Sequence, residues 1–338
     1  MQALYYGGPQ KLYWQEAQAP KLASASEALV RPLAVAVCDL DMGIVAGNSP
    51  FQPPFQLGHE FAAEVVDVGD DVDNFQPGDL VAVSFQPSCG TCPACHRGHS
   101  SACHTASGTP MYGIGSAGGD WGGALSDAVR VPFADAMMVM LPPGMSPAMA
   151  AGASDNIADG YRAVAPALRA RPGAEVLVAG SGSIALYACW WAVQLGAKEV
   201  TLASRDAALL NRAEKFGVQT EQVTLWPKRF RTHAITVDCT GEAAGLSAVL
   251  SSTEAYGHST SCSIYFGGDL TIPMFALNMK GIHFVTGRVN AASLLPEVLA
   301  QIAKYKLTPE TVLATVVEWD DMKDALLNQT FKPIAQRA

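Results

Sequence analysis

The chain of 338 residues is 49% hydrophobic and 16% charged, and its formal net charge is −9. This length and composition predict about two globular domains with sizeable cores and exclude a largely disordered protein. The negative charge and the absence of a Lys/Arg-rich run argue against a nucleic-acid partner, which requires a positive surface.

No export or membrane segment is expected. The first residues, MQALYYGGPQ, lack the basic flank and apolar run of a secretory signal. Apolar stretches such as SIALYACWWAVQLGA, at 183–197, are too short to span a bilayer without polar interruptions. Without an export signal, the eight cysteines indicate a reducing cytoplasm, where clustered cysteines more often bind metal than form disulfides.

Four cysteines fall in one short stretch, PSCGTCPACHRGHSSAC at 87–103. The two-residue gaps let neighbouring thiolates converge on one ion, and a short return loop brings the fourth. Four thiolates suit tetrahedral zinc and fill its coordination positions, so the stretch predicts a structural zinc site. An iron–sulfur cluster is an alternative, and His96 or His99 could replace a cysteine. The predicted ligands are Cys89, Cys92, Cys95 and Cys103.

The stretch from 172 to 206 indicates a strand, a glycine-rich turn and a helix. An apolar strand at 175–179 leads into Gly180-Ser-Gly182-Ser183-Ile184-Ala185, and an apolar segment of helical length follows. This is the dinucleotide-binding pattern G-x-G-x-x-G/A in the setting it requires. Gly180 permits the turn, Gly182 lets the backbone approach a pyrophosphate, and Ala185 allows close helix packing. The helix N-terminus offers its N–H groups to the phosphates.

The next predicted strand, 200–203, ends in Ser204 and Arg205, where an NAD site usually has an acidic residue. A carboxylate would repel the extra phosphate of NADP, whereas a hydroxyl and a guanidinium would bind it. The pair therefore favours NADP(H). The alternative is that Asp206 contacts the ribose and Arg205 is a solvated surface residue.

Later segments continue the strand and helix alternation expected of a doubly wound parallel sheet. Strands are predicted at HAITVDCTG, 233–241, and at CSIYFGG, 262–268. Thr240 is expected at the carboxyl end of its strand, where ligands bind. The spacing of apolar residues at 294–307 predicts an amphipathic helix.

Over essentially its whole length the chain resembles the zinc-containing medium-chain dehydrogenase/reductases, the alcohol dehydrogenase superfamily. Besides the cysteine stretch and the glycine pattern, the resemblance rests on VCDLD (37–41), GHEFAAEVVDVG (58–69), PGDLVAV (77–83) and SDNIADGYRAV (154–164). It implies an α/β protein with a GroES-like, mainly β catalytic domain and a Rossmann domain. The implied catalytic domain covers 1–155 and contains a structural-zinc lobe at 86–104. The implied NADP-binding Rossmann domain covers 156–288, and the segment 289–338 returns to the catalytic domain.

The resemblance also implies a second, catalytic zinc ion, and so two per chain. Cys38 and His59 match its first two ligands and Asp155 the third, which leaves one tetrahedral position for substrate or water. Glu60 matches a carboxylate that can approach the metal when a ligand leaves. Asp41 matches a residue that orients the zinc-binding imidazole.

The activity implied is hydride transfer between a nicotinamide and a small alcohol or carbonyl substrate, in a homodimer or homotetramer. The Ser204-Arg205 pair and the aspartate ligand resemble those of NADP-dependent bacterial alcohol dehydrogenases. Two departures affect the proton path. Leu40 replaces the usual Ser or Thr of the proton relay, and Gly43 replaces a histidine found in some relatives.

The loss of this relay leaves several interpretations open. Asp39, or Asp159 where relatives commonly have Thr, could carry the proton instead, or water could replace the hydroxyl. Leu40 also favours a second hypothesis, an NADPH-dependent reductase of activated C=C or C=N bonds, which needs no alcohol-proton relay. A third, a zinc-stabilised nucleotide sensor, would leave the open zinc site without a purpose.

Overall fold

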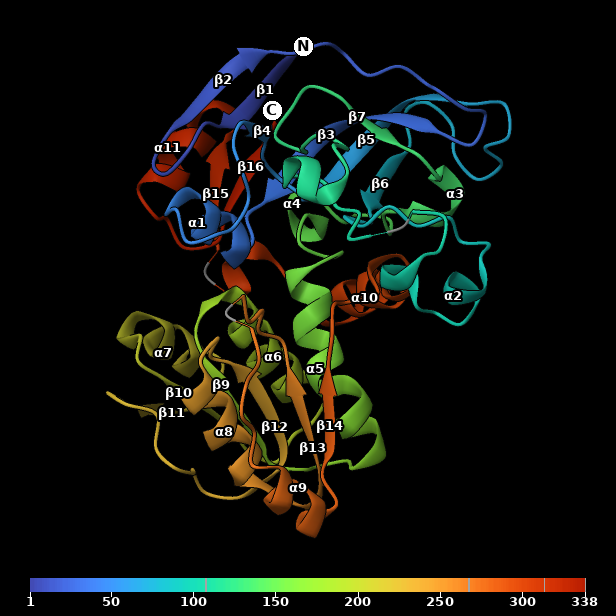
Figure 1. Cartoon of the computed structure of the whole chain (residues 1–338). Coiled ribbons are helices and arrows are strands. Elements are labelled where there is room, and N and C mark those ends of the chain that lie inside the picture. The colour runs from blue at the N-terminus through green and yellow to red at the C-terminus, as the bar shows by residue number, and fades with distance from the viewer. Residues whose placement is uncertain (107, 267, 313, 338) are drawn as a thin grey trace. The chain divides into compact units, whose positions relative to one another are not determined.

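The computed structural model describes residues 1–106, 108–266, 268–312 and 314–337 (Figure 1). The chain divides into two compact units, one formed by residues 1–158 and 289–338 and the other by residues 159–288. None of the helices in the described ranges has the length and apolar character needed to cross a membrane.

The first unit consists mainly of antiparallel strands. Within the described residues, one sheet has the order β15-β16-β3-β5-β6-β8, with β7 paired to β3, and a smaller sheet has the order β2-β1-β4. The strands are β1 Gln2–Tyr6, β2 Leu12–Glu16, β3 Ala28–Ala36, β4 Phe55–Gln56, β5 Glu60–Val68, β6 Leu80–Val83, β7 Val129–Val131, β8 Met138–Met140, β15 Thr315–Glu318 and β16 Pro333–Gln336. The largest core of this unit includes Val35 of β3, Phe61 of β5 and Tyr112 of a connecting segment.

Helices of the first unit are short except for α10. They are α1 Asp39–Val45, α2 Pro93–His96, α3 Ala134–Met137, α4 Pro147–Ala150, α10 Ala291–Tyr305 and α11 Met322–Leu327. The long helix α5, Asn156–Ala170, begins in the first unit and continues into the second. The helix predicted at 294–307 is confirmed by α10, whose buried residues Leu295, Val298, Leu299 and Ile302 lie at helical spacing.

The pairing of three strands brings distant parts of the sequence to one place in the first unit. Ala36, at the end of β3, lies opposite both Glu60 of β5 and Ile334 of β16. The N–H of Val37 donates to the carbonyl of Pro333 at 3.1 Å. Three segments therefore meet beside Cys38: the end of β3, the start of β5 and the residues just before β16.

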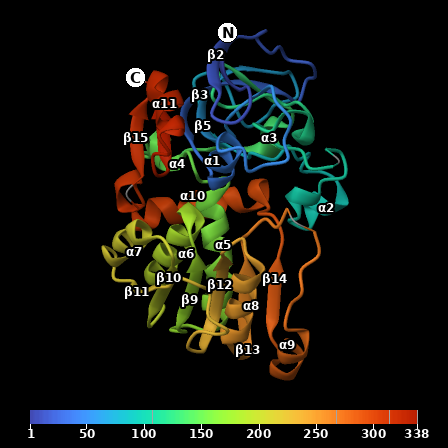
Figure 2. The same cartoon turned by 60° about the vertical axis from the view of Figure 1, so that its left-hand side comes forward.

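The second unit is a parallel sheet with helices packed on it (Figure 2). Its described strands have the order β11-β10-β9-β12-β13-β14, which is doubly wound about β9 and β12. The elements are β9 Val176–Gly180, α6 Gly182–Gln194, β10 Val200–Ser204, α7 Ala207–Glu214, β11 Gln219–Gln222, β12 His233–Cys239, α8 Ala243–Ser252, β13 Thr253–Ser261, α9 Met274–Lys280 and β14 His283–Thr286. The predicted fold class, a mainly β unit joined to a doubly wound parallel sheet, is confirmed.

One predicted strand is wrong. Residues 262–266 follow the end of β13, while Gly267 lies outside the described residues. The strand in this region is β13, TEAYGHSTS, which was not predicted because its sequence is polar. Its last residues are nevertheless buried. The hydroxyl of Thr236 bonds to those of Thr253 and Ser259 at 2.8 and 2.9 Å, so buried hydroxyls replace the apolar side chains expected of a central strand.

Candidate active site

Cys38 lies at the junction of β3 and α1 in the first unit. It is 7% exposed and is the N-cap of α1, where its sulfur accepts the N–H of Leu40 at 3.4 Å. The carboxylate of Asp41 accepts the N–H of Cys38 at 3.1 Å, which completes the helix cap. The cap fixes both the sulfur and the Asp41 carboxylate in place.

His59 is fully buried between two carboxylates. Its Nδ1 lies 3.4 Å from Oδ1 of Asp41, and neither atom has another polar partner among the described residues. Its Nε2 lies 3.2 Å from Oδ2 of Asp155. Asp41 thus orients the imidazole through Nδ1, and the opposite ring nitrogen, Nε2, lies next to the Asp155 carboxylate.

The ligand atoms of Cys38, His59, Glu60 and Asp155 all lie within 4.8 Å of one another. Zinc bonds of about 2.0–2.1 Å in a tetrahedron put neighbouring N and O ligands about 3.3 Å apart. The separation of 3.2 Å between His59 and Asp155 fits that spacing. A thiolate, an imidazole and a carboxylate are donors that zinc accepts, so these residues fit the ion that the resemblance implies.

The carboxylate of Glu60 is bound by Lys332, a buried lysine near the C-terminus. The Nζ of Lys332 donates to both oxygens of Glu60, at 2.9 and 3.0 Å, and to Oδ1 of Asn156 at 2.7 Å. The side chains of Lys332 and Glu60 are 1% and 0% exposed. Because both Glu60 oxygens are bound to the ammonium, Cys38, His59 and Asp155 are the three residues of the cluster that could hold an ion, which would leave one tetrahedral position open.

Asn156 connects this ion pair to the metal ligands. Its Nδ2 donates to the sulfur of Cys38 at 3.2 Å and lies 3.5 Å from Oδ2 of Asp155. Lys332 therefore also fixes the orientation of the Asn156 amide, because a flipped amide would direct its NH2 group at the ammonium.

The electrostatics of the cluster favour a bound cation. Burial, followed by the Asp155 carboxylate, raises the pKa of Cys38 far above its ordinary value. Burial also raises the pKa of Glu60, to about 7, although Lys332 opposes that shift. Burial would lower the pKa of His59, but Asp41 and then Asp155 hold it well above the usual value. A divalent ion would supply the positive charge that the Cys38 thiolate requires.

The four cysteines of the 86–104 lobe also converge in the first unit. The sulfurs of Cys92 and Cys95 are 3.6 Å apart, as are those of Cys89 and Cys103. Zn–S bonds of about 2.3 Å in a tetrahedron put sulfurs about 3.8 Å apart. Backbone N–H groups of Cys89 and Ala106 donate to Cys103, and that of His104 donates to Cys92, as thiolates require. His96 and His99 are exposed outside this cluster.

The glycine turn of the second unit lies between β9 and α6. Gly180 has φ +134°, and a Cβ there would lie 2.1 Å from the carbonyl oxygen of Cys239. Gly182 also has positive φ, and Ser183 and Ile184 form the first turn of α6. The side chain of Ser181 does not cap this helix. A helix N-terminus after a glycine turn is where dinucleotide phosphates bind in such folds.

Arg205 and Ser204 lie at the carboxyl end of β10. The guanidinium of Arg205 binds both oxygens of Glu242, at 2.8 and 2.9 Å, and its Cζ lies 4.9 Å from the ring centre of Trp226. Ser204 is buried and its hydroxyl accepts the N–H of Asp206 at 3.1 Å. Asp206 caps α7 by accepting the N–H groups of Ala208 and Leu209, so that its carboxylate already has partners.

Thr240 follows β12 at the same sheet edge. Its N–H and hydroxyl donate to Oδ1 of Asp238 at 3.0 and 2.7 Å.

Comparison with known proteins identifies the family. Residues 24–143 match the alcohol dehydrogenase GroES-like domain. A glutathione-independent formaldehyde dehydrogenase of Pseudomonas aeruginosa is 30% identical, with 86% of this chain and 74% of that protein covered. This chain belongs to the zinc-containing medium-chain dehydrogenase/reductase superfamily.

Two further relatives support the same assignment. A zinc-type alcohol dehydrogenase-like protein of Schizosaccharomyces pombe is 25% identical over 96% of this chain and 87% of its own. The structure of alcohol dehydrogenase TADH from Thermus sp. ATN1 is 27% identical, has a TM-score of 0.90 and covers 100% of both chains. The resemblance is confirmed, and the protein is a zinc-dependent alcohol oxidoreductase.

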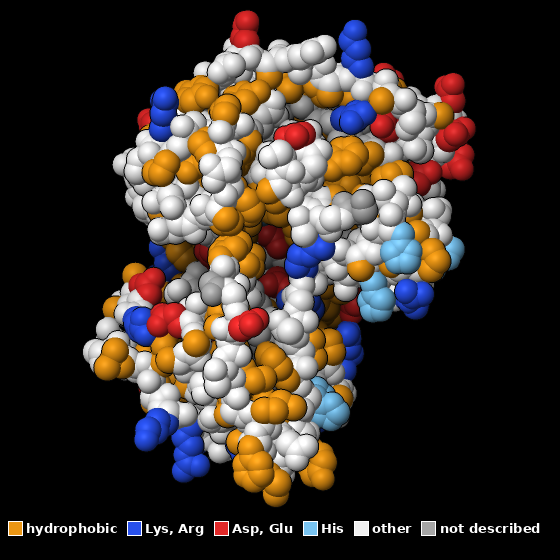
Figure 3. All heavy atoms as spheres, viewed as in Figure 1, with side chains coloured by type: hydrophobic (Ala, Val, Ile, Leu, Met, Phe, Trp, Pro, Cys, Tyr) orange, Lys and Arg blue, Asp and Glu red, His pale blue; other side chains and the backbone are white. Residues whose placement is uncertain are grey.

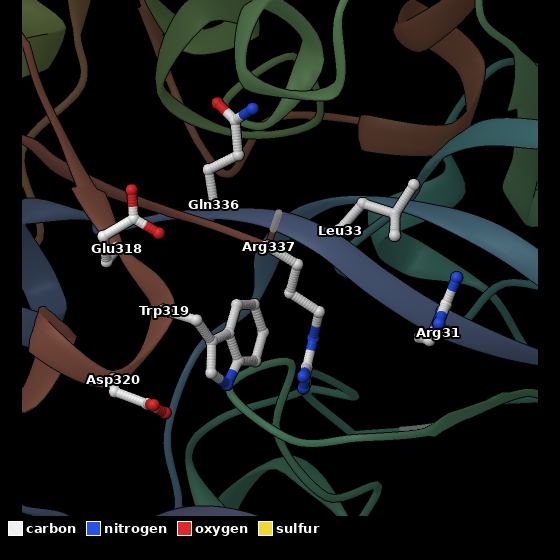
Figure 4. Close-up of a pocket in the computed structure, with 7 residues that line it drawn as sticks. All are labelled: Arg31, Leu33, Glu318, Trp319, Asp320, Gln336 and Arg337. Carbon is white, nitrogen blue, oxygen red and sulfur yellow. The ribbon is translucent and has the colours of Figure 1, made fainter.

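A surface pocket of the first unit lies outside this site. It has a volume of about 380 Å³ and is lined by residues of β3, β15 and β16 with their flanks, including Arg31, Trp319 and Arg337 (Figure 4). Arg337 lies along the Trp319 ring, 3.8 Å from its centre, and binds Asp127 and backbone carbonyls. These contacts hold β16 in place, and no predicted site residue lines the pocket.

Sequence reasoning missed Lys332, Asn156 and Glu242. Lys332 stands between Phe331 and Pro333 in an unremarkable C-terminal segment. Asn156 directly follows the predicted ligand Asp155, which is the only local signal for it. Glu242 follows Thr240-Gly241 at a strand end, and a search for acidic residues at that edge of the sheet would have found it.

The predicted structural zinc site of the cysteine lobe can be tested by substitution. We expect Cys95→Ser to lose one zinc ion per chain and to lower thermal stability, because a structural zinc site contributes its binding free energy to folding. Elemental analysis and thermal unfolding measure both effects. Cys189→Ser, at a buried cysteine of α6, is the matched control and should keep its zinc. Unchanged zinc content in Cys95→Ser would refute this role for the lobe.

Proposed function

We propose that the protein is an NADP(H)-linked, zinc-dependent oxidoreductase that interconverts alcohols with aldehydes or ketones. The observation that carries this proposal is the buried set of Cys38, His59 and Asp155, with Glu60 bound to Lys332. Three protein ligands leave one position for a substrate oxygen, whereas four would close the site. The second zinc ion belongs to the cysteine lobe, whose thiolates require a reducing compartment such as the cytoplasm.

The roles of the residues follow from their contacts. When bound, zinc stabilises negative charge on the substrate oxygen and the nicotinamide exchanges the hydride. Cys38, His59 and Asp155 hold the ion, while Asp41 fixes the ring of His59. Lys332 binds both oxygens of Glu60 and fixes Asn156 beside the Cys38 sulfur.

The proton path remains part of the proposal. Leu40 is half-buried against the core of the first unit and cannot relay a proton. Asp159 is ion-paired with Arg162 in the second unit, whereas Asp39 is exposed in the first turn of α1. Leu40 is also the observation that favours the second candidate, an NADPH-dependent reductase of activated C=C or C=N bonds.

Initial rates with a panel of substrates test the two candidates. The zinc-loaded protein is assayed with NADPH and NADH against aldehydes, ketones, enones and cyclic imines, and in reverse against primary and secondary alcohols. The proposal requires carbonyl and alcohol turnover that stops when the catalytic zinc is removed. Turnover of enones or imines alone, unaffected by loss of that zinc, would establish the second candidate instead.

The NADP(H) preference is supported by Arg205, which is placed at the end of β10 beside an aromatic ring. We expect Arg205→Leu to weaken NADPH binding about 10–100-fold, because a hydrogen-bonded ion pair with phosphate contributes about 1.5–3 kcal/mol. NADH binding should change little. Glu242→Gln should tighten NADPH binding, because it removes a carboxylate that competes with the phosphate for the guanidinium. Fluorescence titration measures all of these affinities.

Arg229→Leu makes the same substitution at an exposed arginine of the same unit and is the matched control. Equal weakening of NADPH and NADH by Arg205→Leu would contradict a phosphate-binding role. It would instead indicate that Arg205 contacts a part common to both cofactors.

We further propose that the protein self-associates through the second unit. Met274, Phe275 and Met279 of α9 are 63%, 80% and 69% exposed, and hydrophobic side chains gather over this helix in Figure 3. The neighbouring β14 is an edge strand, which can pair with β14 of a second copy around a two-fold axis.

Light scattering after size exclusion tests this interface. We expect the protein to be a dimer or tetramer, and Phe275→Glu to weaken the assembly at least about tenfold, because a buried unpaired charge is costly. Leu225→Glu, at a residue 78% exposed elsewhere in the unit, is the control and should assemble normally. A monomeric parent protein would refute the proposal.

A further inference from the structure

Two cysteines of the second unit lie side by side at the ends of neighbouring strands. Asp238 of β12 is opposite Ser261 of β13, and the N–H of Cys262 donates to the carbonyl of Asp238 at 2.9 Å. The pairing therefore continues by one residue, and Cys239 faces Cys262. Adjacent strands lie about 4.8 Å apart, and residues at one register position point to the same face of a sheet. The two cysteine side chains therefore lie next to each other on one face of the sheet.

Hydrogen bonds on both sides of the pair hold the strand ends together. Oδ2 of Asp238 accepts hydrogen bonds from the hydroxyls of Ser261, just before Cys262, and of Tyr265, three residues after it, at 2.6 and 2.7 Å. After the cysteines, the N–H of Gly241 donates to the hydroxyl of Ser263 at 2.9 Å. These cross-strand bonds flank the two cysteines, so the sulfurs are kept close without a covalent link.

The environment of the pair favours thiol chemistry. Both residues are half-buried, whereas Cys189 in the same unit is fully buried. The Cys262 thiol donates to the carbonyl oxygen of Asp159 at 3.9 Å. The thiolate is the reactive form of cysteine, and a half-buried thiol is open to a small oxidant. The hydrogen bond from Cys262, followed by burial, raises the pKa of Cys239, so Cys239 retains its proton.

We propose that Cys239 and Cys262 form a reversible disulfide that weakens nucleotide binding when the protein is oxidised. The strand spacing of about 4.8 Å lies within the Cα separations of about 4.4–6.8 Å found in disulfides. Nothing in the alcohol oxidoreductase activity uses these thiols, so the pair is a separate modification site. The effect on the nucleotide rests on the proposed function, whereas formation of the disulfide does not.

The reaction with hydrogen peroxide as the oxidant is balanced. The Cys262 thiolate attacks one peroxide oxygen, the O–O bond breaks, and a sulfenic acid and one water form, with the thiol proton going to that water. The sulfur of Cys239 then displaces the sulfenic hydroxyl, which leaves as a second water with the Cys239 proton. Two thiols lose two electrons to the peroxide, and one S–S bond forms.

The consequence for the nucleotide follows from the backbone of Cys239. Its carbonyl accepts the N–H of Ser181 at 3.2 Å, and its strand pairs with β9 at Gly180. An added Cβ at Gly180 would lie only 2.1 Å from that carbonyl oxygen, so the strand end packs directly on the glycine turn. A disulfide draws the two Cβ atoms to about 3.8 Å and thereby displaces this strand end.

The experiment uses the zinc-loaded full chain, treated with hydrogen peroxide and then with N-ethylmaleimide to block the remaining thiols. Non-reducing digestion and mass spectrometry should show a peptide that joins Cys239 to Cys262. NADPH affinity, measured by fluorescence, should fall at least about tenfold and recover with dithiothreitol, while zinc content stays constant. Cys262→Ser should resist the loss of affinity, whereas the control Cys189→Ser should behave as the parent protein.

Absence of the joined peptide under conditions that oxidise other thiols would overturn the proposal. A joined peptide with unchanged NADPH affinity, or equal loss in Cys262→Ser, would overturn the control of nucleotide binding. If the reduced protein did not bind NADPH at all, the proposed function would fail, and the peptide map would still decide whether the disulfide forms.

Discussion

Replacing Lys332 with methionine is expected to lower the free energy of unfolding by about 3–5 kcal/mol, the usual cost of removing one partner from a buried ion pair. The variant leaves Glu60, which is fully buried, without the ammonium that binds both of its oxygens. It also leaves Oδ1 of Asn156 without its donor. Denaturant unfolding of the zinc-loaded protein measures the change. Methionine has a similar length and apolar stem, so the space itself stays filled.

A double variant separates this charge effect from a packing effect. Glu60→Gln in the Lys332→Met background removes the unpaired carboxylate, and we expect it to recover most of the lost stability. Lys21→Met, at an exposed lysine of the first unit, should change stability by no more than about 0.5 kcal/mol. If the double variant were as unstable as Lys332→Met, the loss would come from packing and the electrostatic explanation would be wrong.

The same variant should also weaken the catalytic zinc site. Without Lys332, the Asn156 amide is no longer fixed with its NH2 group towards the Cys38 sulfur, and Glu60 is free to turn. Loss of a group that orients a metal ligand typically costs about 10–100-fold in metal affinity. Zinc competition with a chelating dye measures this effect independently of activity.

The sequence predicted best those features whose residues are close together in the chain. The four cysteines of the lobe lie within one loop, and their spacing alone predicts that they converge. The glycine turn is also local, because strand, turn and helix follow one another in the chain. Both patterns specify backbone geometry over a few residues, so no knowledge of the rest of the fold is needed to interpret them.

The resemblance supplied what the sequence alone could not. Cys38, His59 and Asp155 are ordinary residues in their local segments. Cys38 and His59 meet because β3 pairs with β5, and α4, which precedes Asp155, packs on both strands. Lys332 lies 272 residues from Glu60, and the pairing of β16 with β3 is what brings it there. No local pattern distinguishes such a lysine from a solvated one, which is the usual state of lysine. The polar β13 was missed for a related reason, since its buried hydroxyls are satisfied by β12.

Asp155→Asn is expected to remove one zinc ion per chain and to lower kcat/KM for the best substrate by about 10³-fold or more. The substitution keeps the shape of the side chain but removes the charge of one of three ligands. A bound metal ion contributes several kcal/mol of charge stabilisation in the transition state, and each 1.36 kcal/mol is tenfold in rate. Elemental analysis should show about one zinc ion, retained by the cysteine lobe.

Three readouts distinguish loss of the metal centre from general damage. NADPH affinity should be unchanged in Asp155→Asn, because the glycine turn and Arg205 belong to the second unit and Asp155 to the first. Asp120→Asn makes the same substitution at an exposed aspartate of the first unit and should keep both its zinc and its activity. Adding zinc should restore activity partly at most, because His59 loses the carboxylate that lies 3.2 Å from its Nε2. Full activity with one zinc ion per chain would show that the reaction does not use this centre and would favour reduction of C=C or C=N bonds.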